Sequence, residues 1–488
     1  MKNEILRLER VTVMEDETAL LDNFNLHIFK GEIMGLVCIN ANGKESLIKL
    51  ISQNLPIHYG RVYFDEVLVN SYQHSPLTLN KIAVIEQKSR LVEDLSVADN
   101  VFVLRRGFKK YLINHSVLND QLNRFFKEIE PSIDGNDLIA NLSPYEKCVV
   151  ELLRAVVMGA KLIVIMDISN SISAADLIKL HHFLKYYSEK GLSFLYICSH
   201  HEEAFKICNR MSLMKDGKIL KVFYQEEFQN DNMVPFYIGE FSDFERNAEM
   251  RYNTVNILSF QDVCTDKLNH LSFSVAKGEC AVLFDTDNTA LPDILQLMEG
   301  TRSPDSGTVF WENAAYQPKK AWDPIKSGMA FVGEDPIHTM LFEEMSYMEN
   351  LCFLLDQKRN GIRLSKRVLK SIIHEYEPVI GKDIYEQNIM NLNKQALYDL
   401  IFYRLRLFHP KIVFFVQPFA GADLCLRRHL IDLISQMKKD GTTVVILSVN
   451  IADSLVVADK LTLLKNGRFS SEYYRPEFKK FSSEGIVL

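Results

Sequence analysis

The sequence predicts an α/β protein built from two copies of one domain, each with helices packed on a largely parallel sheet. Three observations favour this fold class. Landmark residues recur at a nearly constant offset, and short apolar runs alternate with helical stretches within each copy. The third observation is the length of the chain. The chain has 488 residues, 47% hydrophobic and 24% charged, which suits two or three domains of ~100–200 residues, each able to bury a core.

The repeat is read from short runs that keep their order. Lys30–Glu32 recurs as Lys277–Glu279 after 247 residues, and Leu213–Lys218 recurs as Leu463–Arg468 after 250 residues. Chance does not produce several such landmarks in one order at one spacing. We therefore expect a first domain at residues 1–240 and a second at residues 250–488.

The connector is expected between Tyr224 and Asn253. There the polar runs Gln229–Asn232 and Glu245–Glu249 interrupt the apolar periodicity. The interruption is short, so the sequence predicts a compact connector and not a long charged linker.

Strands and helices are predicted from the apolar runs. Ile33–Val37 precedes a helical stretch at Leu47–Leu50, and Leu162–Met166 precedes another at Ala174–Tyr187. Runs such as Leu162–Met166 and Ile412–Val416 are too short for the ~18 residues of a membrane span. They are typical of parallel strands that are buried on both faces.

Charge and cysteine content exclude several classes of protein. A net charge of −7 and a pI near 6.0 argue against a nucleic-acid binder or a polybasic membrane anchor. The eight cysteines are scattered without a C-x-x-C pair, which favours reduced thiols in a cytosolic chain. The start at Met1–Glu4 leads into a charged stretch, so no secretory signal is expected.

One loop has the position of a phosphate-binding loop, after the strand Glu32–Val37 and before a helix. Its sequence, Cys38–Ser46, departs from G-x-x-x-x-G-K-[ST] because Cys38 replaces the first glycine and Glu45 replaces the Ser/Thr. By itself, a Gly-Lys pair after a strand is a weak signal for nucleotide.

The segments that follow this loop strengthen the interpretation. They are Ile82–Gln87, Leu95–Val101, Leu142–Glu146 with Leu152–Ala155, Leu162–Asp167, and Ser199-His200 before Glu202-Glu203. In order and spacing the series resembles the ATP-binding cassette of ABC transporters: Walker A, Q-loop, signature helix, Walker B and switch histidine. The second copy repeats the series in a more degenerate form. Two cassettes in one chain are most similar to the ATP-binding subunit of ribose- and galactoside-type sugar importers.

The resemblance implies tandem P-loop NTPase domains, each with a mainly parallel core, an antiparallel β part and a helical subdomain. It also implies a site for ATP and Mg²⁺ at the first cassette, where Gly43 admits the phosphates and Lys44 binds them. Asp167 and Gln87 are the expected Mg²⁺ ligands. Glu45 either pairs with Lys44, repels phosphate or ligates the metal. The candidate nucleotide-binding residues are Asn40, Asn42, Gly43, Lys44, Glu45, Ser46, Gln87, Asp167, Asn393 and Lys394.

Both catalytic-glutamate positions have lost their carboxylate. They hold Ile168 and Gln417, and the loss of a general base typically costs ~10²–10⁴ in rate. His200 is the candidate switch histidine, but the loop is one residue short, so Ser199 or His201 is an alternative. His200 is otherwise interpreted as a solvent-facing loop histidine.

The signature helix has lost its phosphate contact. Pro144 and Tyr145 replace the two glycines whose N–H groups would meet the γ-phosphate. Ser143 followed by Glu146 is instead typical of a capping box, with proline in the first helical turn. The sequence therefore predicts a helix start here without a nucleotide contact.

The second copy has no Walker lysine and no Walker B carboxylate. Asp285 and Asp287 are expected to face the place of a triphosphate, and the Walker B pair is Val416-Gln417. Since cassettes of this family pair head to tail, the two halves are expected to pair within the chain. One site then joins Lys44 to Asn393 and Lys394, and the other holds nothing.

The expected function is that of an importer subunit on the inner face of the cell membrane, cytoplasmic, docked on a permease and without a nucleic-acid partner. ATP is expected to bind at the first cassette, with low affinity. Hydrolysis is predicted to be absent or very slow, so the sequence leaves open whether the chain is an enzyme. The alternative is a pseudo-ATPase that regulates or scaffolds a membrane or signalling partner. Tandem-cassette factors that act on ribosomes are disfavoured, because they keep intact motifs and a long charged linker.

Overall fold

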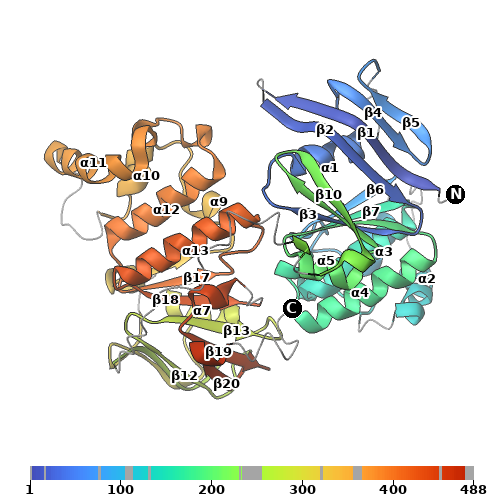
Figure 1. Cartoon of the computed structure of the whole chain (residues 1–488). Coiled ribbons are helices and arrows are strands. Elements are labelled where there is room, and N and C mark those ends of the chain that lie inside the picture. Colours follow the sequence, from blue (N-terminus) through green and yellow to red (C-terminus); the bar gives the residue numbers. More distant parts are fainter. Residues whose placement is uncertain are drawn as a thin grey trace. The chain divides into compact units, whose positions relative to one another are not determined.

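The computed structural model describes residues 3–15, 18–74, 79–104, 114–129, 133–229, 232–233, 255–318, 323–355, 365–449 and 453–478. The chain forms two compact units: residues 1–242 with 421–425, and residues 243–420 with 426–488. Most of the predicted connector, residues 230–231 and 234–254, lies outside the described residues. Each unit contains one four-stranded and one six-stranded sheet (Figure 1).

The first unit contains an antiparallel sheet in the order β2-β1-β4-β5. Its strands are β1 Glu4–Glu15, β2 Thr18–Phe29, β4 Tyr59–Phe64 and β5 Val67–Ser71. Buried and more exposed residues alternate along β1 and β2, as expected of a sheet with one face on the core. The inward side chains, such as Leu6, Leu8 and Phe24, share a core with the second sheet.

The second sheet is mainly parallel, in the order β10-β9-β3-β8-β7-β6. Its strands are β3 Ile33–Cys38, β6 Ile82–Ile85, β7 Leu162–Met166, β8 Ser193–Cys198, β9 Arg210–Lys215 and β10 Lys218–Tyr224. Only β10 runs antiparallel to its neighbour. Every residue of β3 and β8 is buried, because both faces of the sheet are covered.

Helices lie on both faces of this sheet. They are α1 Lys44–Gln53, α2 His115–Ile129, α3 Pro144–Val157, α4 Ala174–Glu189 and α5 His201–Ile207, with a π-helical turn η1 Asp99–Val103. The buried side of α1 packs with the antiparallel sheet on one face. Buried residues of α3, α4 and α5 form a second core on the other face.

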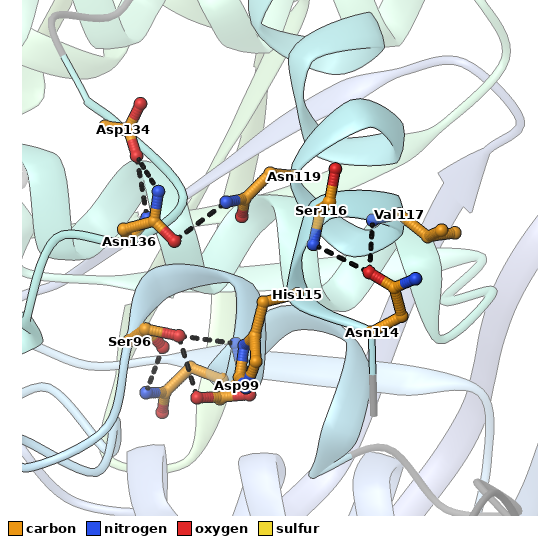
Figure 2. Close-up of polar contacts among 10 residues, drawn as sticks. Ser96, Asp99, Asn114, His115, Ser116, Val117, Asn119, Asp134 and Asn136 are labelled. Atoms are coloured by element: carbon orange, nitrogen blue, oxygen red, sulfur yellow. Dashed lines mark hydrogen bonds and ion pairs between the residues drawn. The ribbon is translucent and has the colours of Figure 1, made fainter. Parts of the chain in front are cut away.

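Hydrogen bonds from short polar side chains stabilise the turns next to η1 and α2 (Figure 2). Ser96 Oγ donates to Asp99 Oδ2 at 2.8 Å and accepts from Asp99 N at 3.1 Å. Asn119 of α2 donates to Asn136 Oδ1 at 2.8 Å, and Asn136 in turn donates to Asp134 Oδ1. These short polar residues satisfy backbone groups that no helix or strand pairs.

The second unit repeats the architecture. Its antiparallel sheet has the order β12-β11-β14-β15, and its mainly parallel sheet has the order β16-β17-β18-β13-β19-β20. The strands are β11 Asn256–Cys264, β12 Leu271–Ala276, β13 Cys280–Asp285, β14 Ser306–Trp311, β15 Ala314–Ala315, β16 Met329–Val332, β17 Ile412–Val416, β18 Thr443–Ser448, β19 Lys460–Lys465 and β20 Arg468–Tyr474. The predicted fold class, tandem cassette-type α/β domains, is confirmed.

The helices of the second unit are α7 Leu291–Glu299, α8 Asp323–Lys326, α9 Pro336–Met340, α10 Tyr347–Cys352, α11 Lys366–Ile380, α12 Lys394–Phe408, α13 Leu424–Lys439 and α14 Ser454–Val457. No helix among the described residues is both long enough and apolar enough to cross a bilayer.

Candidate functional site: the phosphate loops of the two cassettes

The first loop connects the buried strand β3 to α1 and ends at Gly43. Gly43 has φ 80° and is the residue before the helix. A Cβ at this position would lie 2.2 Å from Leu20 O. The glycine is therefore required by the left-handed backbone and by the close approach of β2, independently of any ligand.

Lys44 is paired with the Walker B aspartate. Its Nζ lies 2.8 Å from Asp167 Oδ2, and the two side chains are only 18% and 9% exposed. Burial lowers the pKa of Lys44, but the charge and hydrogen bond of Asp167 outweigh it and raise that pKa overall. Asp167 also accepts a hydrogen bond from Ser199 Oγ at 2.9 Å. Two predicted site residues thus meet directly.

The asparagines of the first loop hold the loop in place. Asn40 Nδ2 donates to Asp216 Oδ1 at 2.7 Å, and Asn40 Oδ1 accepts from Asp216 N at 3.1 Å. Asn42 Nδ2 also donates to Asp216 Oδ1, at 3.3 Å. Asp216 lies in the turn between β9 and β10, so both predicted binding residues tie the loop to that turn.

A cavity of about 440 Å³ opens beside the Lys44–Asp167 pair. Glu45, Gln87 and Asp167 all line it, with Glu86 and Lys88. The structure therefore brings the two predicted Mg²⁺ ligands, Gln87 and Asp167, to one cavity. Glu45 is exposed and Ser46 is half-buried in the first turn of α1.

The residues expected to activate water are not carboxylates. Ile168 follows Asp167 and is only 3% exposed, packed in the core. His200 is half-buried at the start of α5, and the residue that reaches Asp167 with its hydroxyl is Ser199, one of the two sequence alternatives. Glu203 of α5 is fully buried, and burial raises its pKa.

The second loop is closed by its own aspartate. Asp285, at the end of β13, is fully buried and accepts three backbone hydrogen bonds. Oδ2 accepts from Thr289 N and Ala290 N, each at 2.6 Å, and Oδ1 accepts from Asp287 N at 3.2 Å. The Asp285 carboxylate thus turns into the loop's own N–H groups. Burial raises its pKa, while these three bonds lower it.

Three further site positions of the first cassette hold other residues in the second. Leu291 stands in the position of Lys44 and is 4% exposed, packed in the core. Gln417 was predicted in the catalytic-glutamate position, but it follows β17 as Asp167 follows β7, so it stands in the position of Asp167 and Pro418 stands in that of Ile168. The Nε2 of Gln417 donates to Glu334 Oε1 at 2.8 Å. Glu334 in turn stands in the position of Gln87. The second cassette thus has an amide–carboxylate pair in the positions of Asp167 and Gln87.

The residues of the first loop fit a nucleotide with Mg²⁺: a lysine begins the helix, and a carboxylate and an amide share the adjacent cavity. Those of the second loop do not fit, because the loop amides are already bonded to Asp285 and no lysine is present. Within the described part of the chain, no group of three or more His, Cys, Asp or Glu side chains is arranged to hold a metal.

Both signature helices begin at a capping side chain, and the cap of the first was predicted. Ser143 forms a capping box with Glu146 at the start of α3, which confirms the helix start. Tyr145 packs against the core of its own unit, with Lys179 Nζ 5.5 Å from its ring. In the second unit, Asn393 caps α12 through Ala396 N at 2.9 Å, and Lys394 is exposed. The pairing of Asn393 and Lys394 with the first loop stays a prediction.

Two buried asparagines with a structural role were missed from the sequence. Asn100 makes three hydrogen bonds to the segment 92–96, and Asn350 makes four to the segment 342–346. Both side chains are fully buried. The signal was present, since the two asparagines lie 250 residues apart, the offset of the repeat.

The comparisons with known proteins agree with the fold. Residues 21–167 match the protein-family model described as ABC transporter. The ribose import ATP-binding protein RbsA of Clostridium perfringens is 23% identical over 471 residues, covering 94% of this chain and 93% of its own. The xylose import ATP-binding protein XylG of Moorella thermoacetica is 23% identical, covering 98% and 97%. The galactose/methyl galactoside import ATP-binding protein MglA of Pasteurella multocida is also 23% identical, covering 92% and 90%.

A solved structure of similar fold is the archaeal ribosome recycling factor aABCE1 in complex with the ribosomal stalk protein aP1. It has a TM-score of 0.58 and 14% identity, and covers 98% of this chain and 92% of that one. At this identity the likeness concerns the fold alone. The chain thus consists of two tandem α/β domains with the ATP-binding cassette fold. It resembles the ATP-binding subunits of ribose- and galactoside-type sugar importers over nearly its whole length.

Proposed function

We propose that the chain is the ATP-binding subunit of a sugar-type ABC importer that binds ATP and Mg²⁺ only at its first cassette and hydrolyses ATP very slowly or not at all. The contrast between the two loops carries the proposal. Lys44 and Asp167 meet at 2.8 Å in the first cassette, whereas the second has Leu291 and Gln417 in these positions. The proposed site is cytoplasmic, at the inner face of the membrane.

At the first cassette, Lys44 would bind the β- and γ-phosphates, and Asp167 with Gln87 would hold Mg²⁺. Bound Mg²⁺ would neutralise phosphate charge. Lys44 must first leave Asp167, and Glu45 lines the adjacent cavity, where its carboxylate would repel phosphate. Both costs reduce affinity, so we infer weak binding. Asn393 and Lys394 of the second cassette complete the proposed site.

Hydrolysis needs a group that orients or deprotonates water. In the catalytic-glutamate position, the first cassette has Ile168, which is aliphatic and packed in the core, and the second has Pro418. Neither side chain can act as a general base, and the lack of such a base typically costs ~10²–10⁴ in rate. The proposed role therefore rests on nucleotide binding and not on rapid turnover.

Titration of the full chain with ATP and Mg²⁺ by calorimetry, with phosphate release measured alongside, tests the proposal. We expect one weak site and turnover no higher than that of Lys44→Ala. The matched control is Lys185→Ala, which removes an exposed lysine of α4 that does not line this cavity and should bind like the wild type. Two sites, or turnover well above that of Lys44→Ala with permease present, would contradict the proposal.

The proposed partner is a membrane permease, and a groove in the first unit supports its docking. A cavity of about 710 Å³ lies along the edge strand β6 and is lined by Arg90, Glu151 and Arg154 beside the apolar Ala83 and Met158. Arg90 also lines the cavity that contains Gln87 and Asp167. A permease helix seated in the groove would therefore contact the same loop that reaches the nucleotide.

Co-sedimentation with permease-containing membranes tests the docking. We expect Arg154→Glu to reduce binding at least ~5-fold, since a reversed charge in a contact opposes a complementary partner. Arg61→Glu reverses an exposed arginine of β4 and should bind normally. Equal binding by both variants would place the docking surface elsewhere.

The second candidate function is that of a pseudo-ATPase that regulates or scaffolds its partner without nucleotide. The capped signature helix with Pro144 and Tyr145 favours it. Sugar uptake in cells that carry only Lys44→Ala separates the two roles. Lost uptake supports nucleotide-dependent transport, and normal uptake supports the nucleotide-independent role.

A further inference from the structure

The last residue of the strand before the phosphate loop differs between the two cassettes. Cys38 ends β3 and Asp285 ends β13, in the same position of the repeat. Cys38 is buried, and its Sγ contacts Met214 Sδ at 4.0 Å. The carboxylate of Asp285 is buried as well, but it is turned toward the loop that follows it.

The bonds to Asp285 have the arrangement of an anion site. Thr289 N and Ala290 N converge on one oxygen at 2.6 Å, and Asp287 N reaches the other at 3.2 Å. Successive backbone N–H groups that enclose one concavity are the typical protein site for a phosphate oxygen. Here the anion is a side chain of the loop itself.

The neighbouring aspartate does not compete for these N–H groups. Asp287 Oδ2 accepts from Asn466 N at 2.6 Å. In the first cassette, Asn40 Oδ1 accepts from Asp216 N in the same way. The second loop thus keeps the attachment to its neighbouring turn and differs where Asp285 replaces Cys38.

We propose that the second loop is a self-occupied anion site, in which the Asp285 carboxylate takes the place of a bound phosphate and removal of that carboxylate creates a site for inorganic phosphate. This inference rests on the proposed function and deepens it, because it gives a physical reason why the second cassette would bind no nucleotide. The carboxylate keeps the loop folded without ligand, since buried N–H groups need an acceptor.

The test replaces Asp285 with alanine in the full chain and adds inorganic phosphate. Both tryptophans, Trp311 and Trp322, belong to the second copy, and Trp311 shares the core that contains Ala290 and Leu291. Tryptophan fluorescence during thermal unfolding therefore follows this cassette. We expect Asp285→Ala to lower the transition temperature and about 20 mM phosphate to raise it again by about 3 °C or more, by mass action.

Two controls isolate the anion site. Potassium chloride at the same ionic strength should not restore Asp285→Ala, and phosphate should leave the wild type unchanged beyond the chloride effect. Cys38→Ala, the matched change in the first cassette, should show no phosphate response in tryptophan fluorescence. An equal phosphate response in all three proteins, or none in Asp285→Ala, would overturn the inference.

If Asp285→Ala does not fold, hydrogen exchange on the wild type decides. The amides of Thr289 and Ala290 should exchange at least ~100-fold slower than unprotected amides, because both are bonded to a buried carboxylate. Fast exchange at both amides would overturn the inference. The outcome is separable from the proposed function, which fails if wild-type protein binds two nucleotides, whatever Asp285→Ala does.

Discussion

The two cassettes share a fold but stabilise their phosphate loops in opposite ways. In the first, an ion pair between Lys44 and Asp167 spans the site. In the second, Asp285 bonds to the loop amides, and Gln417 bonds to Glu334. The first arrangement borders a cavity lined by Gln87 and Asp167, whereas the second bonds its polar groups to one another.

The difference teaches that loss of a ligand site requires replacement as well as removal. A buried donor or acceptor without a partner costs about 1–3 kcal/mol. In the second loop the Asp285 carboxylate is the acceptor for the N–H groups of Thr289 and Ala290, and the amide of Gln417 bonds to the carboxylate of Glu334. The four predictions below test this comparison, from the largest expected effect to the smallest.

The largest effect is expected where the ion pair is broken. Asp167→Gln leaves the Lys44 ammonium without its partner, and we expect a loss of about 3 kcal/mol in the free energy of unfolding. The double variant Lys44→Leu/Asp167→Gln imitates the second cassette and should recover most of this loss. Urea unfolding followed by circular dichroism measures both.

Lys49→Leu is the matched control on the exposed face of the same helix and should change stability by less than about 0.5 kcal/mol. Strictly additive losses in the double variant would contradict the ion-pair explanation, since residues in contact are expected to couple.

Acid should destabilise the first cassette selectively. Burial, followed by nearby lysines, lowers the pKa of His181 to about 4. A lowered pKa gives stability that is present above pH ~6.5 and lost as the pH falls toward 4, about 2.5 kcal/mol near pH 4.5. The second cassette has Ile431 and Ile446 in the positions of His181 and Tyr196.

Unfolding between pH 7 and 4.5, followed by hydrogen exchange in each cassette, measures the difference. Glu203 opposes the effect in part, because its raised pKa favours the folded state at low pH. His181→Gln should flatten the pH dependence, and His182→Gln, at the exposed neighbouring position, should not. Equal acid sensitivity of both cassettes would refute the assignment.

The two buried asparagines should differ in their effect. Asn100→Ala removes the bonds to its loop and should cost about 2 kcal/mol. Asn350→Ala should cost about 1 kcal/mol more, because Asn350 Oδ1 also accepts from Arg404 Nη2 at 3.0 Å. Arg404 is 2% exposed, and burial lowers its pKa to about 10. Urea unfolding compares the variants, and a larger loss for Asn100→Ala would count against this explanation.

The smallest effect is expected at the caps of the signature helices. Ser143→Ala and Asn393→Ala should each cost about 1 kcal/mol, because each removes the acceptor of a first-turn N–H group. Thermal unfolding measures both losses. A loss of nucleotide affinity in Ser143→Ala beyond this change in stability would mean that the helix start keeps a ligand contact.

Much of the fold was predictable because the signals were local or repeated. The runs Leu162–Met166 and Ile412–Val416 are the strands β7 and β17 as expected. The capping box at Ser143 was also predictable, since it needs only residues within one helical turn. Lys44 and Asp167 were predicted as partners in one site, and they lie 2.8 Å apart.

The directions of individual side chains were not predictable. An aspartate in a loop can face solvent or its own backbone, and the sequence around Asp285 does not distinguish the two. The pair of Gln417 and Glu334 joins residues 83 positions apart, from the ends of two adjacent parallel strands. Neither contact has a local sequence signature.

The sequence by itself determined the repeat, the order of strands and helices, and which charged groups of an ATP-binding cassette are missing. These depend on spacing and residue type, which the chain records directly. The tertiary structure decided what takes the place of the missing groups: Asp285 on the loop amides and Gln417 on Glu334. Such contacts arise only when burial forces each polar group to find a partner among residues brought together by folding.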